Sequence, residues 1–363
     1  MSTLPKSVFA PKSVAVAGAS SNADSPGHDY VRALVEFGFS GPIYPINPRA
    51  PEIMGLKAYA SLADVPGDID LVISCIPAIS VLELIEQSRM KNVTALHLFT
   101  GRFSETGTEE GAALEREVQR AASAAKIRII GPNCMGMYDS SSKLSFRPDL
   151  PRDAGDVAFI SQSGNNSVEL MLHGAARGLR FSKVVSYGNA LDVTEADLLD
   201  LLAEDPATRV VGGYIEGTSD GRRLFEALKK CARVKPVVIL KGGRTSSGSR
   251  TAASHTAALA GRRQVWSAML HQAGAVEVAT FDELIDMLVA FAFLRPGSGT
   301  TVGPAAGPTV GVVGGGGGRA VQSADVCEEA GLRVPKLPDS IRAMLREKAP
   351  QLADWVDNPV DQS

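Results

Sequence analysis

From residue 12 onward, short apolar runs rich in β-branched residues alternate with longer segments in which apolar residues recur at helical spacing. Strands of this kind, separated by helices, are typical of a parallel sheet that helices cover on both faces. The pattern then repeats further along the chain. It therefore predicts an α/β protein with more than one domain.

The first set of runs predicts a five-stranded Rossmann-like domain over residues 1–150. Helices are expected at 79–90 and 108–125. The expected strands are 13–18, 42–47, 70–75, 94–99 and 127–130.

A second set of runs predicts a flavodoxin-like domain with a parallel sheet over residues 151–295. It closes with a helix at 281–294. Its expected strands are 156–161, 181–186, 209–217 and 235–243.

Residues 296–308 are rich in Gly, Pro and Ser and lack an apolar period, which indicates a linker. Residues 309–363 then begin another strand, a glycine loop at 314–318 and a helix at 319–331, as in a second flavodoxin-like domain. This last part is shorter than a typical domain of roughly 100 residues. We expect it to be incomplete here or completed elsewhere.

Charge and composition exclude several classes of function. The 37 basic residues are dispersed among 40 acidic ones, for a net charge of −3, so we expect no nucleic-acid partner. No apolar run is long enough for a membrane span and the N-terminus resembles no signal peptide, so a cytoplasmic location is expected. The four cysteines are far apart, which predicts reduced thiols and no structural metal.

The first expected strand leads into GASSNADSPGH (18–28), a turn of small residues before a helix. Such a turn brings backbone N–H groups close to a phosphate, although it also serves as a plain connection. The second strand ends at Asn47-Pro48-Arg49, where an NAD site usually has an acidic residue. Arg49 suits the ribose phosphate of CoA or NADP, unless it is a solvated surface residue.

Two further segments, LFTGRFSETG (98–107) and GPNCMG (131–136), follow strands of the same sheet. The carboxyl ends of parallel strands form the ligand-binding edge of such folds, so these segments are expected to line one crevice. Cys134 is interpreted as a buried small residue and is given no role in the chemistry.

In the second domain, SQSGNNS (161–167) lies between a strand and a helix, where the first N–H groups of the helix can bind an anion. The alternative is an ordinary serine N-cap.

The segment AASHTAALAG (252–261) places His255 among small residues, where it has no aliphatic partners nearby in the sequence. An imidazole there can accept a phosphoryl group, and Glu216, at the end of a strand in the same sheet, is the candidate carboxylate to orient it. A capping or surface histidine and a solvated strand-end glutamate are the alternatives.

Nine ordered motifs resemble ADP-forming acetyl-CoA synthetases and, more distantly, the alpha subunit of succinyl-CoA synthetase. The similarity covers about residues 8–294 and, weakly, the glycine loop and NPVD (358–361). The motifs are GAS (18–20), PINPR (45–49), IPA (76–78), GPNCMG (131–136), SQSG (161–164), EADLLDLLAEDPATR (195–209), YIEG (214–217), KPVVILKGGR (235–244) and SHTAALAG (254–261).

The resemblance implies a role for each matching residue. His255 would be the phosphorylated histidine and Glu216 the carboxylate that orients it. The expected CoA-binding residues are Gly18, Ser20, Ser21, Arg49, Thr100 and Gly101. The expected phosphate-binding residues are Ser161, Ser163 and Gly164.

The family joins a carboxylic acid to CoA through an acyl phosphate and a phosphohistidine that passes phosphate to ADP or GDP. The positions after SQSG are Asn165, Asn166, Ser167 and Val168, where the alpha subunit of the succinyl enzyme has different residues. The resemblance therefore does not identify the carboxylic acid that is used. The chain has no recognisable ATP-grasp domain, so Mg-ATP or ADP is expected to bind to a partner domain or beta subunit, in an oligomer.

Two other functions compete with this one. The first is a non-catalytic CoA-sensing module, which would have no need for His255 and Glu216. The second is an NADP-dependent oxidoreductase, which leaves the second domain unexplained.

Overall fold

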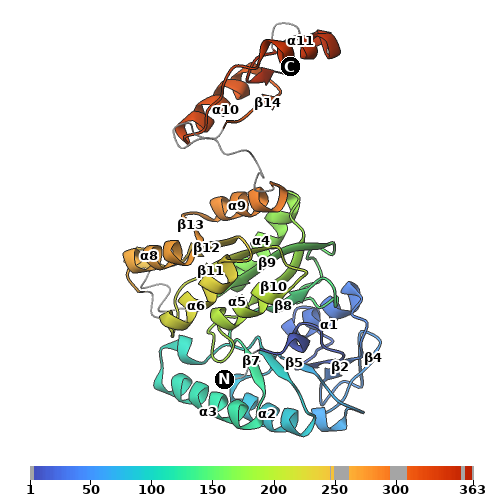
Figure 1. Cartoon of the computed structure of the whole chain (residues 1–363). Helices are drawn as coiled ribbons and strands as arrows, with labels where there is room; N and C mark the ends of the chain where they lie inside the picture. Colours follow the sequence, from blue (N-terminus) through green and yellow to red (C-terminus); the bar gives the residue numbers. More distant parts are fainter. Residues whose placement is uncertain (1–3, 246, 249–260, 295–308, 353–355, 362–363) are drawn as a thin grey trace. The chain divides into compact units, whose positions relative to one another are not determined.

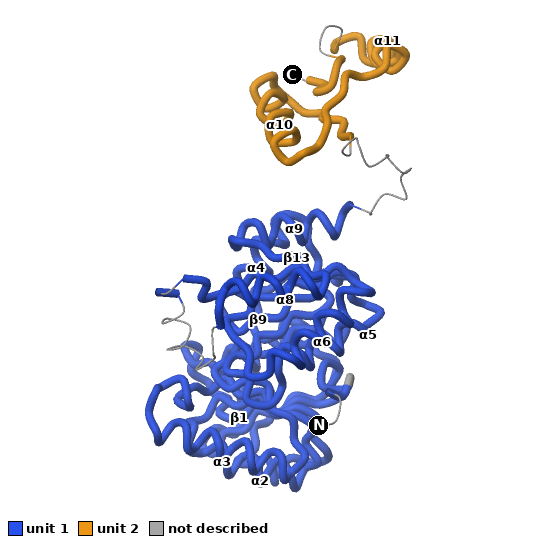
Figure 2. The backbone as a smooth tube through the Cα atoms, turned by 60° about the vertical axis from the view of Figure 1, so that its left-hand side comes forward, with its two compact units in different colours: residues 1–295 blue, residues 296–363 orange. Residues whose placement is uncertain are grey.

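The computed structural model describes residues 4–245, 247–248, 261–294, 309–352 and 356–361. The chain divides into two compact units, Met1–Arg295 and Pro296–Ser363 (Figure 2). The predicted linker, 296–308, lies outside the described residues.

The first sheet has five parallel strands, and it confirms the five strands that the sequence predicts. Because β1 lies between β2 and β5, the strand order reverses between β1 and β5, which is where open α/β sheets bind ligands. In spatial order the strands are β2 (Ile43–Ile46), β1 (Val14–Ala17), β5 (Leu71–Ser74), β6 (Ala95–Leu98) and β7 (Arg128–Ile130).

Helices bury both faces of this sheet. Val14 and Val16 of β1 pack in one hydrophobic cluster with α1 (Pro26–Phe37). Their neighbours Ala15 and Ala17 point the other way, into a cluster with α2 (Val81–Met90) and α3 (Glu109–Ala125). Since successive residues of a strand face opposite sides, this explains why the strands are apolar throughout.

The second sheet has five parallel strands and one antiparallel edge strand. In spatial order they are β13 (Val276–Val278), β12 (Val237–Lys241), β11 (Val210–Ile215), β9 (Ala154–Ser161), β10 (Phe181–Ser186) and β8 (Gly136–Asp139). The four predicted strands are present, whereas β8 and β13 were not predicted. β8 precedes the predicted domain boundary at residue 150 and pairs with β10.

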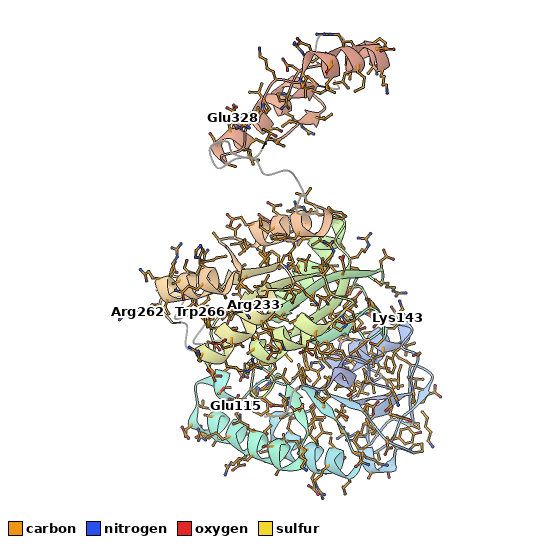
Figure 3. All side chains as sticks on the ribbon, in the orientation of Figure 1. Glu115, Lys143, Arg233, Arg262, Trp266 and Glu328 are labelled. Atoms are coloured by element: carbon orange, nitrogen blue, oxygen red, sulfur yellow. The ribbon has the colours of Figure 1, made fainter. Side chains whose placement is uncertain are left out.

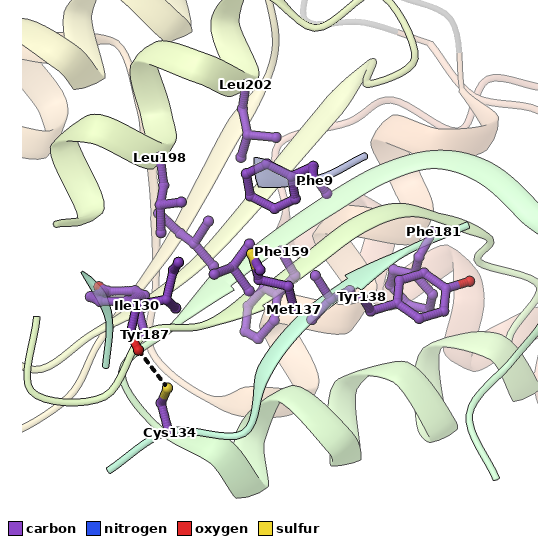
Figure 4. Close-up of a cluster of buried hydrophobic side chains, with 14 of the residues drawn as sticks. Phe9, Ile130, Cys134, Met137, Tyr138, Phe159, Phe181, Tyr187, Leu198 and Leu202 are labelled. Atoms are coloured by element: carbon purple, nitrogen blue, oxygen red, sulfur yellow. Dashed lines mark hydrogen bonds between the residues drawn. The ribbon is translucent and has the colours of Figure 1, made fainter. Parts of the chain in front are cut away.

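Two layers of helices enclose the second sheet (Figure 1). One layer contains α4 (Gly164–Ala176) and α9 (Phe281–Phe293). The other contains α5 (Glu195–Glu204), α6 (Gly221–Ala232) and α8 (Arg263–Ala273). In the core beneath α5, Leu198 and Leu202 lie over Phe159 of β9, with Met137 of β8 and Phe9 beside them (Figure 4).

The remaining elements of the first unit are short. Two short strands, β3 (Glu52–Ile53) and β4 (Leu56–Lys57), form a hairpin. The 3₁₀ helices are η1 (Lys6–Val8), η2 (Leu62–Asp64), η3 (Ala78–Ser80) and η4 (Ser104–Thr106).

The second unit pairs β14 (Val313–Gly314) with β15 (Val360–Asp361) in parallel. It also contains α10 (Gly317–Glu329), α11 (Asp339–Lys348) and η5 (Pro350–Leu352). The Asn358 side chain accepts from Val312 N and donates to two backbone carbonyls, which ties the two strands together.

Within the described residues, no helix is both long enough and apolar enough to span a membrane.

Candidate functional site

The turn after β1 depends on Gly18. Gly18 has a φ of +84°, and a Cβ at this position would lie 2.9 Å from Cys75 O. Asn47 closes the turn from the second strand, because its side-chain amide donates to Ala19 O at 2.8 Å. The carboxyl ends of β1, β2 and β5 are thereby held together.

Gly27 allows α1 to begin directly against this turn. A Cβ on Gly27 would lie 2.0 Å from Gly18 O, so the helix and strand approach as closely as backbones can. Ser25 caps the helix by accepting from His28 N at 3.2 Å. Glycines have the same role in dinucleotide-binding turns. Gly27 was not recognised in the sequence because its spacing from Gly18 does not fit the GxGxxG pattern of such turns.

A cavity of about 430 Å³ opens at this strand edge, beside the point where the strand order reverses. Gly18 and Ser20, two of the predicted CoA-binding residues, line it together with Asn47, Pro48 and Ser80. A larger cavity of about 830 Å³ lies at the end of α3 and the start of β7. Because ligands of such sheets bind at the carboxyl ends of the strands, we assign the site to the smaller cavity.

Ser21 and Arg49 are exposed and do not line this cavity. Arg49 follows Pro48, which does line it, and Arg49 N donates to the Asn47 side chain at 2.8 Å. The backbone at residue 49 is thus fixed at the rim, and the contact of its guanidinium group with CoA stays a prediction.

Thr100 and Gly101 lie at the same edge, after β6. The Thr100 hydroxyl donates to Ile76 O at 2.6 Å, so it connects this loop to the end of β5. A Cβ on Gly101 would lie 3.0 Å from Glu105 Oε1.

The GPNCMG loop joins the first sheet to the second. Asn133 N donates to Thr100 O at 3.0 Å, and Met135 N donates to Oγ of Ser186, the last residue of β10, at 3.1 Å. Cys134 is buried, as predicted, and its thiol contacts Ile130 O at 3.7 Å (Figure 4). Burial raises the pKa of the Cys134 thiol well above its ordinary value, which disfavours the thiolate at neutral pH.

The predicted phosphate-binding residues form a compact turn between β9 and α4. The Ser163 hydroxyl caps α4 by accepting from Asn166 N at 3.3 Å, as in an ordinary N-cap. Ser161 Oγ accepts from Ser163 N at 3.0 Å and donates to Ser163 O at 2.7 Å. Both hydroxyls therefore shape the turn, and the N–H groups of Gly164 and Asn165 remain as candidate donors to an anion.

Gln162 brings Glu216 next to this turn. Glu216 follows β11, the neighbour of β9, and is 9% exposed. The Gln162 side-chain oxygen accepts from the backbone N–H groups of Glu216 and Gly217, the two being 2.5 and 3.0 Å away. The structure thus places Glu216 and the SQSG turn side by side, and Gln162 is a site residue that sequence reasoning missed.

Burial, together with the Glu216 carboxylate, raises the pKa of Tyr214 above its ordinary value. Tyr214 precedes Glu216 by two residues, and the two side chains are hydrogen-bonded to each other.

His255 lies outside the described residues, so the structure does not test its distance from Glu216. Glu216 follows β11, and Gly242 follows the adjacent strand β12. Of the described part of the chain, no group of three or more His, Cys, Asp and Glu is arranged to hold a metal ion.

Comparison with known proteins agrees with this geometry. Residues 12–139 match a family described as a CoA binding domain, and residues 154–291 match a succinyl-CoA ligase-like flavodoxin domain.

Among curated proteins, the chain is 36% identical to the alpha subunit of acetate–CoA ligase (ADP-forming) II of Pyrococcus furiosus, over 97% of this chain and 75% of that subunit. It is also 36% identical to the acetate–CoA ligase (ADP-forming) of Methanocaldococcus jannaschii, over 98% of this chain and 49% of that protein. The chain therefore spans three quarters of the separate alpha subunit and about half of the longer ligase.

Among solved structures, the chain resembles the dinucleotide-forming acetyl-coenzyme A synthetase 1 of Ca. Korarchaeum cryptofilum, determined with phosphate and ADP. The TM-score is 0.85 at 33% identity, over 98% of this chain and 75% of that one.

Proposed function

Since the chain belongs to the ADP-forming acetate–CoA ligase family and corresponds to its alpha, CoA-binding portion, we propose that it binds CoA in its first domain and carries phosphate on His255 in its second. The observation that supports this most strongly is that the GPNCMG loop joins the carboxyl edges of the two sheets. Asn133 of the loop donates to Thr100 O at the edge of the first sheet, and Met135 donates to Ser186, which pairs with Ser161 in the second sheet.

The proposed reaction is reversible and has three steps. Inorganic phosphate attacks the thioester carbon of acyl-CoA, the C–S bond breaks, and acyl phosphate and CoA thiol result. His255 then attacks phosphorus, the P–O bond to the acyl group breaks, and the carboxylic acid leaves. Finally ADP takes the phosphoryl group from phosphohistidine and forms ATP.

The second domain supplies two groups for the phosphoryl steps. The N-terminus of α4 offers N–H donors and a positive helix end, worth about 0.3–2 kcal/mol to an anion. Glu216 would hold the imidazole so that one nitrogen faces phosphorus.

The last step needs a nucleotide site, which we assign to an ATP-grasp domain or beta subunit that works with this chain and binds Mg-ATP or ADP. The relative with 75% coverage is named as an alpha subunit, and the solved synthetase contains phosphate and ADP. We propose an oligomer that contains both parts. The carboxylic acid is not assigned.

Arg49→Glu is expected to weaken CoA binding by about 1–3 kcal/mol, because a charge-assisted contact is lost and repulsion is added. Isothermal titration calorimetry with CoA, dephospho-CoA and NAD measures this. Arg222→Glu, at an exposed position on α6, makes the same charge change away from the first sheet and is the control. Equal CoA affinity in the Arg49 and Arg222 variants would show that Arg49 is only a surface residue, and tighter binding of NAD than of CoA would overturn the cofactor assignment.

Glu216→Gln is expected to slow phosphorylation of the chain by roughly 10- to 100-fold, by analogy with carboxylates that orient metal-bound histidines. The rate of phosphohistidine formation, measured with radiolabelled phosphate and acetyl-CoA, tests this. Glu226→Gln on α6 is a matched control, since its partner is the exposed Arg222. A Glu216 variant that labels as fast as the control would remove Glu216 from the mechanism. A wild-type chain that binds CoA but takes label neither from acetyl-CoA with phosphate nor from Mg-ATP through an ATP-grasp partner would favour a CoA-sensing module.

A further inference from the structure

Lys241, the last residue of β12, connects the carboxyl ends of two neighbouring strands. The residue is 3% exposed, and Nζ donates to Glu216 O at 2.6 Å. Nζ also donates to Gly242 O. One ammonium group therefore holds the backbone at the end of β11 and the backbone that leaves β12.

Trp266, in the first turn of α8, lies against the same ammonium group. The centre of its ring is 4.9 Å from Lys241 Nζ, within the range of a cation–π interaction. Gly261, with a φ of +64°, packs directly on the indole, because a Cβ there would lie 2.7 Å from Trp266 Nε1. Figure 3 places Trp266 beside Arg262 at the start of α8. Lys241 thus contacts Gly242, and Trp266, which lies against Lys241, contacts Gly261.

The Glu216 backbone is consequently held from both sides. Gln162 accepts from its N–H group and Lys241 donates to its carbonyl oxygen. There is little free space around it, since a Cβ on Gly242 would lie 3.1 Å from Glu216 Cγ and 2.6 Å from the Tyr214 hydroxyl. Rotation of the peptide groups around residue 216 would break these hydrogen bonds, so Lys241 contributes to the direction of the carboxylate.

We propose that Lys241 is a positioning residue for Glu216, and that its charged ammonium group keeps the ends of β11 and β12 in the arrangement that phosphoryl transfer requires. This inference rests on the function proposed above, in which Glu216 orients His255.

The charges that face Lys241 give the proposal a pH dependence. Burial lowers the pKa of Lys241 to about 8, the Glu216 carboxylate after β11 opposes this shift, and Arg244 after β12 adds to it. Hydrogen bonds from a charged donor are about twice as strong as neutral ones, so the hold on the two carbonyls weakens above that pH. Phosphorylation should therefore slow as the pH rises through about 8.

Protein stability should change in the opposite direction. The pKa of Lys241 is lower in the folded chain than the ordinary value of 10.5, so between the two values the unfolded chain binds more protons. The contribution of Lys241 to the free energy of unfolding then increases with pH. A loss of activity through loosening of the whole fold would instead lower both quantities.

The test compares wild type, Lys241→Met and Lys241→Arg in the chain combined with its ATP-grasp partner. The rate of labelling by acetyl-CoA and radiolabelled phosphate is measured from about pH 6 to 10, a range that spans the pKa of Lys241 in the folded chain. Wild type should lose rate above pH 8. Lys241→Met should be about tenfold slower at pH 7, without that decline, because a charge-assisted bond of about 1.5 kcal/mol is lost. Lys241→Arg stays charged throughout, so it should label faster than Lys241→Met and show no decline near pH 8.

The outcomes separate the two hypotheses. CoA affinity and thermal unfolding of each variant confirm that it folds, and if Lys241→Met does not fold, the pH profile of Lys241→Arg decides. Absence of label in wild type, both from acetyl-CoA with radiolabelled phosphate and from radiolabelled Mg-ATP through the ATP-grasp partner, would contradict the proposed function itself. Normal labelling in wild type, with the same rate and the same alkaline decline in both variants, would overturn the role of Lys241 alone.

Discussion

Replacing His255 by alanine is expected to abolish phosphorylation of the chain and to reduce acyl-CoA synthesis by about 10³-fold or more, the scale on which enzymes lose rate when a covalent nucleophile is removed. The expected loss of rate is large because, in the proposed reaction, His255 alone carries the phosphoryl group. No other side chain in the SHTAALAG segment is a comparable phosphoryl acceptor near neutral pH. Glu216 and the α4 N-terminus can orient or stabilise a phosphoryl group, but they cannot carry it.

Radiolabelled phosphate and the stability of the label measure this result. A phosphohistidine is expected to be labile in acid and stable in alkali, unlike a phosphoserine. His173→Ala and His271→Ala, which change exposed histidines in the last turns of α4 and α8, should label normally and are the controls. CoA affinity should be the same in all three variants, because His255 belongs to the second domain. Wild-type synthesis by the His255 variant would exclude the phosphohistidine mechanism.

Gly27→Ala is expected to destabilise the first domain by about 3 kcal/mol, the upper part of the usual range for overpacking, and to weaken CoA binding by at least about tenfold. The added methyl group would lie 2.0 Å from Gly18 O, which belongs to the backbone and cannot rotate away. Helix α1 must therefore move away from the turn that lines the cavity. This shift would displace both the backbone N–H groups at the start of α1 and the Gly18 turn that lines the cavity.

Gly221→Ala is the matched control, because Gly221 also lies in the first turn of a helix, α6, and its added Cβ would meet only Thr218 Cγ2 at 4.0 Å. Chemical denaturation and calorimetry with CoA compare the two variants. Nearly equal free energies of unfolding in the two variants would show that α1 can shift without loss of stability. A destabilised Gly27 variant with unchanged CoA affinity would separate this turn from the ligand site.

The hydrophobic pattern predicts most strands correctly because a strand that is buried on both faces needs an unbroken apolar run. The run at 13–18 is an example, since Val14 and Ala15 enter different clusters. β8 lacks such a run: Gly136 begins it and Asp139 ends it. Its pairing with β10 stabilises a sequence that is not typical of a strand, which is why it was missed.

Among the site residues, too, some were predicted from the sequence and others were missed. Glu216 and the SQSG turn were found because they follow strands, and parallel strands align their carboxyl ends at one edge. Gln162 and Lys241 were missed because each acts on the backbone of a residue more than 20 positions away. Sequence spacing gives no sign of such a contact.

Patterns along the chain were enough to predict the α/β class, nine of the described strands, the family and the residues that are candidates for phosphoryl transfer. Apolar periodicity and local motifs are properties of neighbouring residues, so they can be recognised along a single chain. The folded structure was needed to show that Gly27 must lack a side chain, that Gln162 and Lys241 hold Glu216 from opposite sides, and that the GPNCMG loop joins the two strand edges. These depend on distances between segments that the chain brings together only when both sheets have formed.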